Sequence, residues 1–147
     1  MKAQFNSRSE ARIHDASPRA SIHSSFKENK MADNQLVILS KAFAVNVINL
    51  CDLLKNRKKA SAIISQLLRS GTSIGANIHE ANYASSKADF VNKFQIALKE
   101  CYETDYWLDI FHDTGIVNEE EYSEMISQCS KIRKLLIASI NTAKKNE

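Results

Sequence analysis

Apolar side chains recur at intervals of three and four residues through four successive segments of this chain, between about residues 34 and 145. This spacing places them on one face of a helix, so each segment is predicted to be an amphipathic helix. Only three glycines and one proline occur in 147 residues, which is typical of long helices joined by few turns. The pattern therefore predicts an all-α fold.

The links between the four segments are short and contain residues that commonly mark helix ends. Ser86, followed three residues later by Asp89, predicts the start of the third helix. Gly115 is predicted to end it in the left-handed conformation, and Asn118 with Glu121 predicts a capping box at the start of the fourth. Short links make consecutive helices antiparallel neighbours, so we predict an antiparallel up-down-up-down four-helix bundle over residues 34–147.

The charge is unevenly distributed along the chain. Residues 1–30 hold six basic and three acidic side chains, and fourteen of each remain in the rest of the sequence. Residues 1–33 also lack apolar periodicity, so they are predicted to form a disordered basic tail, and their acidic residues disfavour a mitochondrial transit peptide. The bundle itself is formally neutral, which weakens an electrostatic case for nucleic-acid binding.

The longest apolar stretch, residues 36–54, is interrupted by polar and charged side chains, so no membrane span is predicted. Cys51, Cys101 and Cys129 lie far apart in apolar patterns. Three cysteines without CxxC spacing argue against a disulfide framework and against a zinc site. We expect them to be core thiols of a cytoplasmic protein.

Small residues interrupt the second segment at a cost of about 1 kcal/mol for each helical glycine relative to alanine. Gly71 and Gly75 share a helix face, which predicts close approach of a neighbouring helix. The residues predicted to allow this packing are Ser70, Gly71, Ser73, Gly75 and Ala76. A kink and a phosphate-binding loop beside Arg69 are the alternatives, although no GxxxxGK[ST] pattern is present.

No arrangement of residues typical of an active site is apparent. Glu-x-x-His pairs of di-iron bundles are absent, and the adjacent pairs His79-Glu80 and His112-Asp113 point to different helix faces. Cys101 with either histidine lacks a recognisable oxyanion-hole segment. We therefore expect no catalysis, no metal and no cofactor.

Several polar residues fall where helices are expected to pack. Acidic groups on one face of the third helix more often pair with basic groups than act as catalytic acids, and Arg69 is a suitable partner. The residues predicted to form a buried polar network are Arg69, Asn77, Glu80, Glu103 and Asp105.

The third helix also carries a cluster of aromatic and apolar residues, namely Tyr102, Tyr106, Trp107 and Ile110. Stacking on nucleic-acid bases usually requires a basic groove, which the neutral bundle lacks. Tyrosine and tryptophan are enriched in subunit interfaces, and the apolar faces exceed what one bundle requires. The cluster therefore predicts self-association.

The link after the first helix is basic and includes Arg57, Lys58 and Lys59. In an up-down bundle it lies at the same end as the acidic residues 119–124, so the two regions are expected to neutralise each other. Phosphate contacts by these three residues are the alternative.

Residues 66–81, 86–90, 96–100 and 103–108 together resemble the four-helix-bundle protein family encoded in intervening sequences of bacterial 23S rRNA genes. The resemblance covers about residues 36–145. It implies a homopentameric ring around a central channel in a bacterial cytoplasm. The chain is also similar to accessory proteins of diversity-generating retroelements, which are basic pentamers that bind nucleic acid and a reverse transcriptase.

The neutral bundle departs from that basic pattern, and His79 occupies a position where the family more often has a small residue. Our leading hypothesis is a non-catalytic homo-oligomeric scaffold, with no membrane association. The alternative is a nucleic-acid-binding accessory factor that acts with a reverse transcriptase or an rRNA partner.

Overall fold

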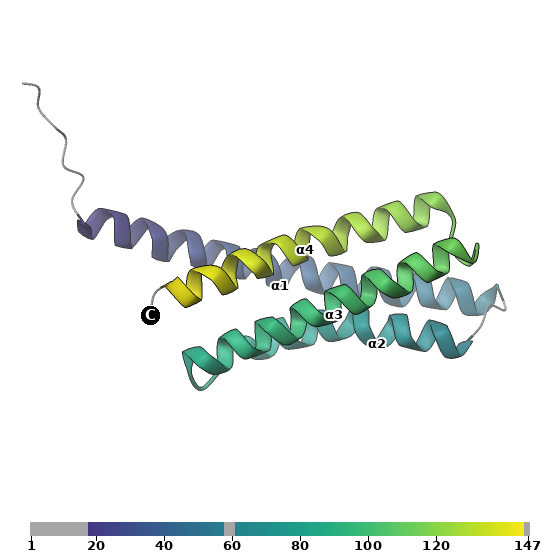
Figure 1. Cartoon of the computed structure of the whole chain (residues 1–147), viewed down its shortest axis with the longest axis horizontal. Coiled ribbons are helices and arrows are strands. Elements are labelled where there is room, and N and C mark those ends of the chain that lie inside the picture. The colour runs from purple at the N-terminus through teal and green to yellow at the C-terminus, as the bar shows by residue number, and fades with distance from the viewer. Residues whose placement is uncertain (1–17, 58–60, 146–147) are drawn as a thin grey trace, which may run out of the picture.

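Four helices form the described part of the chain. The computed structural model describes residues 18–57 and 61–145, with side chains described from Ala32 onward. The helices are α1 (Pro18–Asn56), α2 (Ser61–Ala81), α3 (Lys87–Asp113) and α4 (Glu119–Lys145). Each helix packs against the next, and α4 returns to pack against α1 (Figure 1). The predicted all-α up-down bundle is therefore confirmed.

The first helix is longer than the sequence pattern predicts, because α1 begins at Pro18 rather than near Asn34. Proline suits the first turn of a helix, since its fixed φ is helical and its missing N–H would have no intrahelical partner there. Extending an existing helix is also easier than nucleating a new one. The backbone of residues 18–33 is thus helical, which corrects part of the predicted tail. Residues 1–17 of that tail lie outside the described residues.

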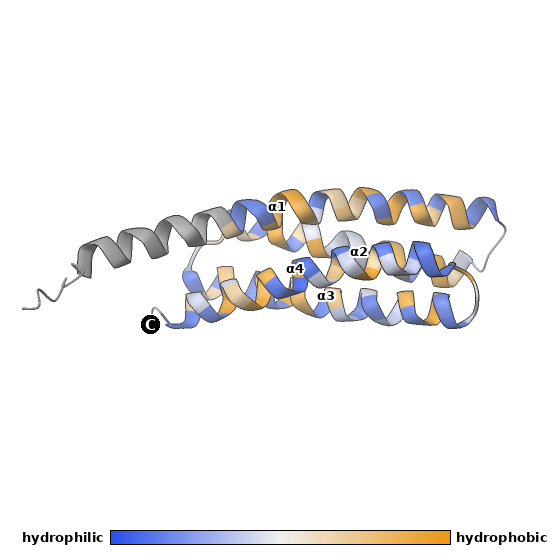
Figure 2. Cartoon of the chain, turned by 90° about the horizontal axis from the view of Figure 1, so that it is seen from above, coloured by the Kyte–Doolittle hydropathy of each residue, from blue (hydrophilic) through white to orange (hydrophobic). Residues whose placement is uncertain are grey.

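The core lies between the four helices and consists of their inward-facing apolar side chains. Figure 2 shows hydrophobic and hydrophilic residues alternating along each helix, as expected for amphipathic helices. The largest fully buried side chains are Phe43, Phe94, Phe111, Leu36, Leu54, Ile64, Leu67, Ile74, Ile78, Leu108, Ile132 and Leu136. Burial of each contributes on the order of 1.5–3 kcal/mol relative to exposure. Within the described residues, α1 and α3 lie diagonally across the bundle, and no Cα atom of one is within 8 Å of a Cα atom of the other.

The predicted helix boundaries are confirmed at three positions. The Glu121 N–H donates to Asn118 Oδ1 at 2.8 Å, and the Asn118 N–H donates to Glu121 Oε2 at 2.9 Å. Ser86 Oγ accepts from the Asp89 N–H at 3.1 Å. Gly115 has a φ of 66°, the left-handed conformation that favours glycine. These residues satisfy backbone groups that helix ends leave unpaired.

Candidate assembly surfaces

The small-residue segment of α2 packs closely against α1, as predicted. A Cβ atom added at Gly71 would lie 2.8 Å from Val47 Cγ2, and one added at Gly75 would lie 3.3 Å from the backbone oxygen of Ser40. Both glycines therefore allow the α1 surface to approach α2. The segment is continuous α-helix, so the alternative of a phosphate-binding loop is wrong.

The other small residues of the segment have different surroundings. Ser70 is fully buried and accepts a hydrogen bond from Thr104 Oγ1 on α3 at 3.0 Å. The backbone carbonyl of Ser73 accepts from Asn77 Nδ2 at 2.9 Å. Ala76, in contrast, is exposed, so the prediction that it lies in a closely packed contact is wrong. It faces away from the core because it follows Gly75 by one residue, about 100° around the helix.

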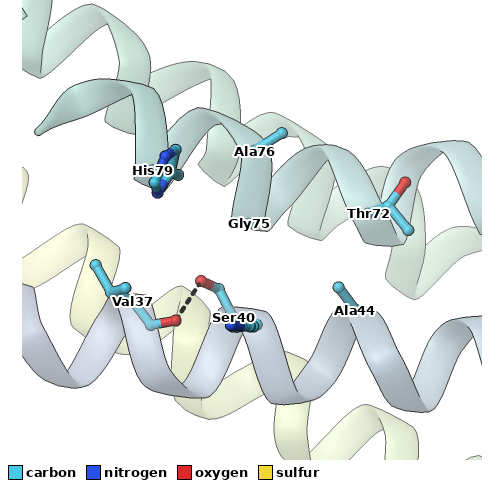
Figure 3. Close-up of a pocket in the computed structure, with 8 residues that line it drawn as sticks. Val37, Ser40, Ala44, Thr72, Gly75, Ala76 and His79 are labelled. Carbon is cyan, nitrogen blue, oxygen red and sulfur yellow. Dashed lines mark hydrogen bonds between the residues drawn. The ribbon is translucent and has the colours of Figure 1, made fainter. Parts of the chain in front are cut away.

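An open pocket of about 320 Å³ lies between α1 and α2, and we call it the α1–α2 groove. Figure 3 shows side chains of both helices facing each other across it, with His79 near one end and Thr72 near the other. Its lining residues are Val37, Ser40, Lys41, Ala44, Thr72, Gly75, Ala76 and His79. The groove is hollow because small side chains from both helices meet there.

Next to this groove, α1 presents apolar side chains to solvent. Ile38 is 68% exposed, Val45 49%, and Ile48 and Leu53 are each 42% exposed. We call these four residues the α1 outer face. The sequence contained a signal for this exposed face. Ile38 and Val45 are seven residues apart, and neither belongs to the apolar positions that face the core.

The apolar character of α1 raises the question of a membrane span. Within the described residues, Ala32–Asn56 is long and apolar enough to cross a bilayer, judged by length and composition alone. The core helix of a soluble bundle passes the same test, and α1 packs against both α2 and α4. About a third of its apolar window is buried inside the bundle.

The aromatic cluster on α3 divides into exposed and half-buried parts. Tyr102 and Tyr106 are 54% and 56% exposed, and we call this pair the α3 tyrosines. Trp107 and Ile110 instead pack partly against the core. The Trp107 indole N–H donates to Glu103 Oε1 at 3.2 Å, and its ring meets the Tyr106 ring edge-on at 5.1 Å.

The predicted polar network is not a buried unit. Arg69 is 50% exposed and joins Glu103 and, at 3.4 Å, Glu100 on α3. The guanidinium of Arg69, followed by the Trp107 indole, lowers the pKa of the Glu103 carboxyl. Exposed pairs of this kind contribute roughly 0–1 kcal/mol each. Long charged side chains reach solvent here because their Cα positions lie at the rim of the helix contact.

The remaining members of that predicted network have separate partners. Glu80 pairs with Lys93 of α3 at 2.5 Å, with Glu80 56% exposed. Asp105 pairs with Arg133 of α4, and both are largely shielded from solvent, at 18% and 25% exposure. Arg133 also lies over the Tyr102 ring, 5.5 Å from its centroid.

The basic link behaves as expected where it is described. Arg57 reaches Glu121 at 2.9 Å, which joins the first link to the acidic start of α4. Burial would raise the pKa of Glu121, but the Asn118 N–H and the Arg57 guanidinium outweigh it and lower the pKa. Lys58 and Lys59 lie outside the described residues. Arg57 is therefore engaged within the bundle.

The three cysteines are buried and carry free thiols. Burial raises the pKa of Cys51 to about 11. The Cys129 thiol donates to the Cys101 backbone oxygen at 3.6 Å. Interaction with the Cys101 side chain, followed by burial, raises the pKa of Cys129. Thiolate, the reactive form of cysteine, is therefore disfavoured at Cys51 and Cys129.

His79 and His112 do not lie beside the thiols. His79 is exposed, with its ring 5.5 Å from that of Tyr83. His112 hydrogen-bonds Glu119 at 2.8 Å and stacks on Tyr122 at 4.4 Å. Across the part of the chain that the structure describes, no group of three or more His, Cys, Asp or Glu side chains could hold a metal ion.

These features define a small up-down four-helix bundle whose most distinctive surface is an apolar helix face beside a hollow groove. Residues 32–138 match the family model of the 23S rRNA-intervening sequence protein, and the chain belongs to this family. It is similar to a protein of unknown function from the S23 ribosomal protein family of Bacteroides thetaiotaomicron, known from a crystal structure. The two are 46% identical with a TM-score of 0.73, over 75% of this chain and 98% of the other. Among curated proteins, none matches this chain.

Proposed function

We propose that this chain acts by assembling with copies of itself into a non-catalytic scaffold in the cytoplasm, with no membrane association. The observation that carries the proposal is the α1 outer face, where four large apolar side chains are each at least 42% exposed. Burying such side chains gains about 25 cal/mol for each Å² removed from water. A second copy of the chain is the simplest partner for this face, because assembly then requires no other molecule.

The resemblance to the intervening-sequence family supports a ring of five copies. In a ring, each copy contacts one neighbour through one surface and the other neighbour through a different surface. Such head-to-tail contacts form a closed ring when the rotation between neighbours closes. The α1 outer face and the α3 tyrosines are two separate exposed surfaces that suit this requirement. Five chains of 16.6 kDa would have a mass of about 83 kDa.

The proposal of a non-catalytic role is supported by the surroundings of the reactive side chains. All three thiols are buried, and the pKa values of Cys51 and Cys129 are raised. The carboxylates of Glu80 and Glu103 are paired with basic groups at the surface. An active site needs a nucleophile or base that is accessible and oriented toward a substrate.

Light scattering of the purified chain over a concentration range tests self-assembly. We expect a mass that is a multiple of 16.6 kDa, and a ring of five would give about 83 kDa. The double variant Ile38→Lys/Val45→Lys should shift the equilibrium toward monomer, because a charge would have to be buried at each contact. Ala138→Lys, at an exposed position on α4, is the matched control. A monomer at every concentration would refute the proposal.

The same sample separates scaffolding from nucleic-acid binding. A protein that contacts phosphates loses affinity steeply as salt rises. Because Arg57 is paired with Glu121, we expect the bundle to show no salt-dependent retention of RNA or DNA at low ionic strength. Salt-sensitive binding that disappears on changing Arg57, Lys58 and Lys59 to alanine would favour the nucleic-acid-binding role instead.

A further inference from the structure

The bundle carries a hollow surface and a protruding surface that suit each other in shape. The α1–α2 groove is hollow because Ala44, Gly75 and Ala76 line it with little more than methyl groups and backbone. Its volume of about 320 Å³ is large enough for an aromatic side chain. The α1 outer face borders this groove along the same helix and extends the apolar surface around it.

The protruding surface is the pair of α3 tyrosines. Tyr102 and Tyr106 are four residues apart, so they project from the same side of α3, and more than half of each side chain is exposed. Tyrosine is a frequent anchor in interfaces, because it offers a large rigid area at low entropic cost and a hydroxyl that can stay wet. Among the described residues of α3, these two tyrosines are the large hydrophobic side chains that are exposed.

We propose that the α3 tyrosines of one copy dock into the α1–α2 groove of the next copy, against its α1 outer face. The inference rests on the proposed self-assembly and names the two surfaces that meet. Within the described residues, α1 and α3 are diagonal, with no Cα atoms of the two within 8 Å of each other, so the groove and the α3 tyrosines lie on different sides of one chain. Contacts between them therefore run head to tail, which is the type of contact that closes into a ring.

The charges of the groove and of the α3 surface next to Tyr106 favour this pairing. Lys41 and His79 are the ionisable residues that line the groove, and no acidic side chain lines it. On α3, the exposed Asp109, which accepts a hydrogen bond from the Tyr122 hydroxyl at 2.8 Å, follows Tyr106 by three residues on the same side of the helix. The exposed Lys99 precedes Tyr102 by three residues on that side. A cationic side chain also favours the face of a tyrosine ring, as the Arg133 guanidinium does with Tyr102 within one chain.

Disulfide capture between two single-cysteine variants of the full chain tests the docking. The natural cysteines are all buried, so an introduced surface cysteine should react first. We expect Ala76→Cys and Tyr106→Cys proteins, mixed and mildly oxidised, to form a linked pair on a non-reducing gel. A chain carrying both changes should form a ladder of linked copies. The matched control is Tyr106→Cys mixed with Ala138→Cys, which places the second thiol on α4 and should not link.

Two results would overturn the docking. Efficient linkage of Ala76→Cys with itself, without the Tyr106→Cys partner, would indicate a two-fold contact of the groove face instead. Equal linkage in the control mixture would indicate random collision. Either result would leave self-assembly as such intact.

A second measurement does not depend on disulfide geometry. Ala76→Phe would fill the groove from an exposed position, so it should weaken assembly about tenfold or more in light scattering, whereas Ala138→Phe should not. Far-ultraviolet circular dichroism would check that both variants keep the helical fold. If the unmodified chain assembles and Ala76→Phe leaves the affinity unchanged, the docking is refuted alone. If the unmodified chain is a monomer, the proposed function fails with it.

Discussion

Gly71 and Gly75 lie one turn apart on α2 and face the same helix, yet they bound two different kinds of surface. At Gly71 an added Cβ would meet both γ-carbons of Val47, at 2.8 and 2.9 Å. At Gly75 the nearest atom is 3.3 Å away, and the residue also lines the open α1–α2 groove. Gly71 thus allows close packing of the two helices at one turn, whereas Gly75 borders an open groove at the next. The difference shows that one sequence motif serves both the fold and a surface.

The largest expected contrast lies on α1 itself, between Leu36 and Ile38. Leu36 is fully buried and Ile38 is 68% exposed, two residues away. We expect Leu36→Ala to lower the free energy of unfolding by about 2–5 kcal/mol, because it leaves a cavity. Ile38→Ala should change it by less than about 0.5 kcal/mol. Urea unfolding, followed by circular dichroism at a protein concentration where the chain is monomeric, measures both.

An equal loss of unfolding free energy in Ile38→Ala and Leu36→Ala under those conditions would contradict this contrast. The α1 outer face would then be covered within a single chain, and its role in assembly would lose its basis. A loss of stability in Ile38→Ala that appears only at high protein concentration would instead support it, because the loss would then come from the contact between copies.

The two glycines provide the next contrast. Gly71→Ala should destabilise the fold by about 1–3 kcal/mol through overpacking, because the branched Val47 side chain is stiff at χ1 and cannot move aside cheaply. Gly75→Ala should lie within about 1 kcal/mol of the unchanged protein, because improved helix propensity offsets the tight contact with Ser40. Thermal unfolding of both variants gives the measurement. Adding Val47→Ala to Gly71→Ala should recover part of the loss, and no recovery would contradict the steric explanation.

The smallest expected effect concerns the rim, where the first link meets α4. The pKa of Glu121 is lowered in the folded protein, so its carboxylate stabilises the fold above the ordinary value of 4.5. That contribution is lost as the pH falls through the folded pKa. Glu121→Gln keeps a capping side chain but loses the charge, so it should cost up to about 1 kcal/mol at pH 7. The two proteins should converge in unfolding free energy as the pH falls through the lowered pKa of Glu121, and a constant difference would contradict the ionic origin.

The helix ends show how much of the fold could be predicted from sequence. The capping residues Asn118 and Ser86 and the left-handed Gly115 act through bonds to residues within a few positions, so the local sequence suffices to predict them. The start of α1 could not be predicted in the same way. Residues 18–33 lack the apolar periodicity that marks a packed helix, and their helical backbone continues one already formed downstream.

The candidate surfaces were only partly predictable. The α3 tyrosines were expected at an interface and are exposed, but whether they form one stays a prediction. Trp107 and Ile110 of the same cluster turned out to pack on the core. The polar residues around Arg69 were expected to be buried together, and they form separate pairs instead. Burial of a polar side chain depends on how far its helix is rotated about its own axis, which spacing alone leaves open.

The sequence by itself determined that this chain forms four amphipathic helices and where α3 begins and ends and α4 begins, because these properties follow from local spacing and capping chemistry. Its motifs also indicated the family. Only the tertiary structure decided which apolar residues of α1 stay in solvent and that small residues leave a groove between α1 and α2. Those outcomes depend on the relative rotation and separation of neighbouring helices, which are set by packing between side chains far apart in the sequence.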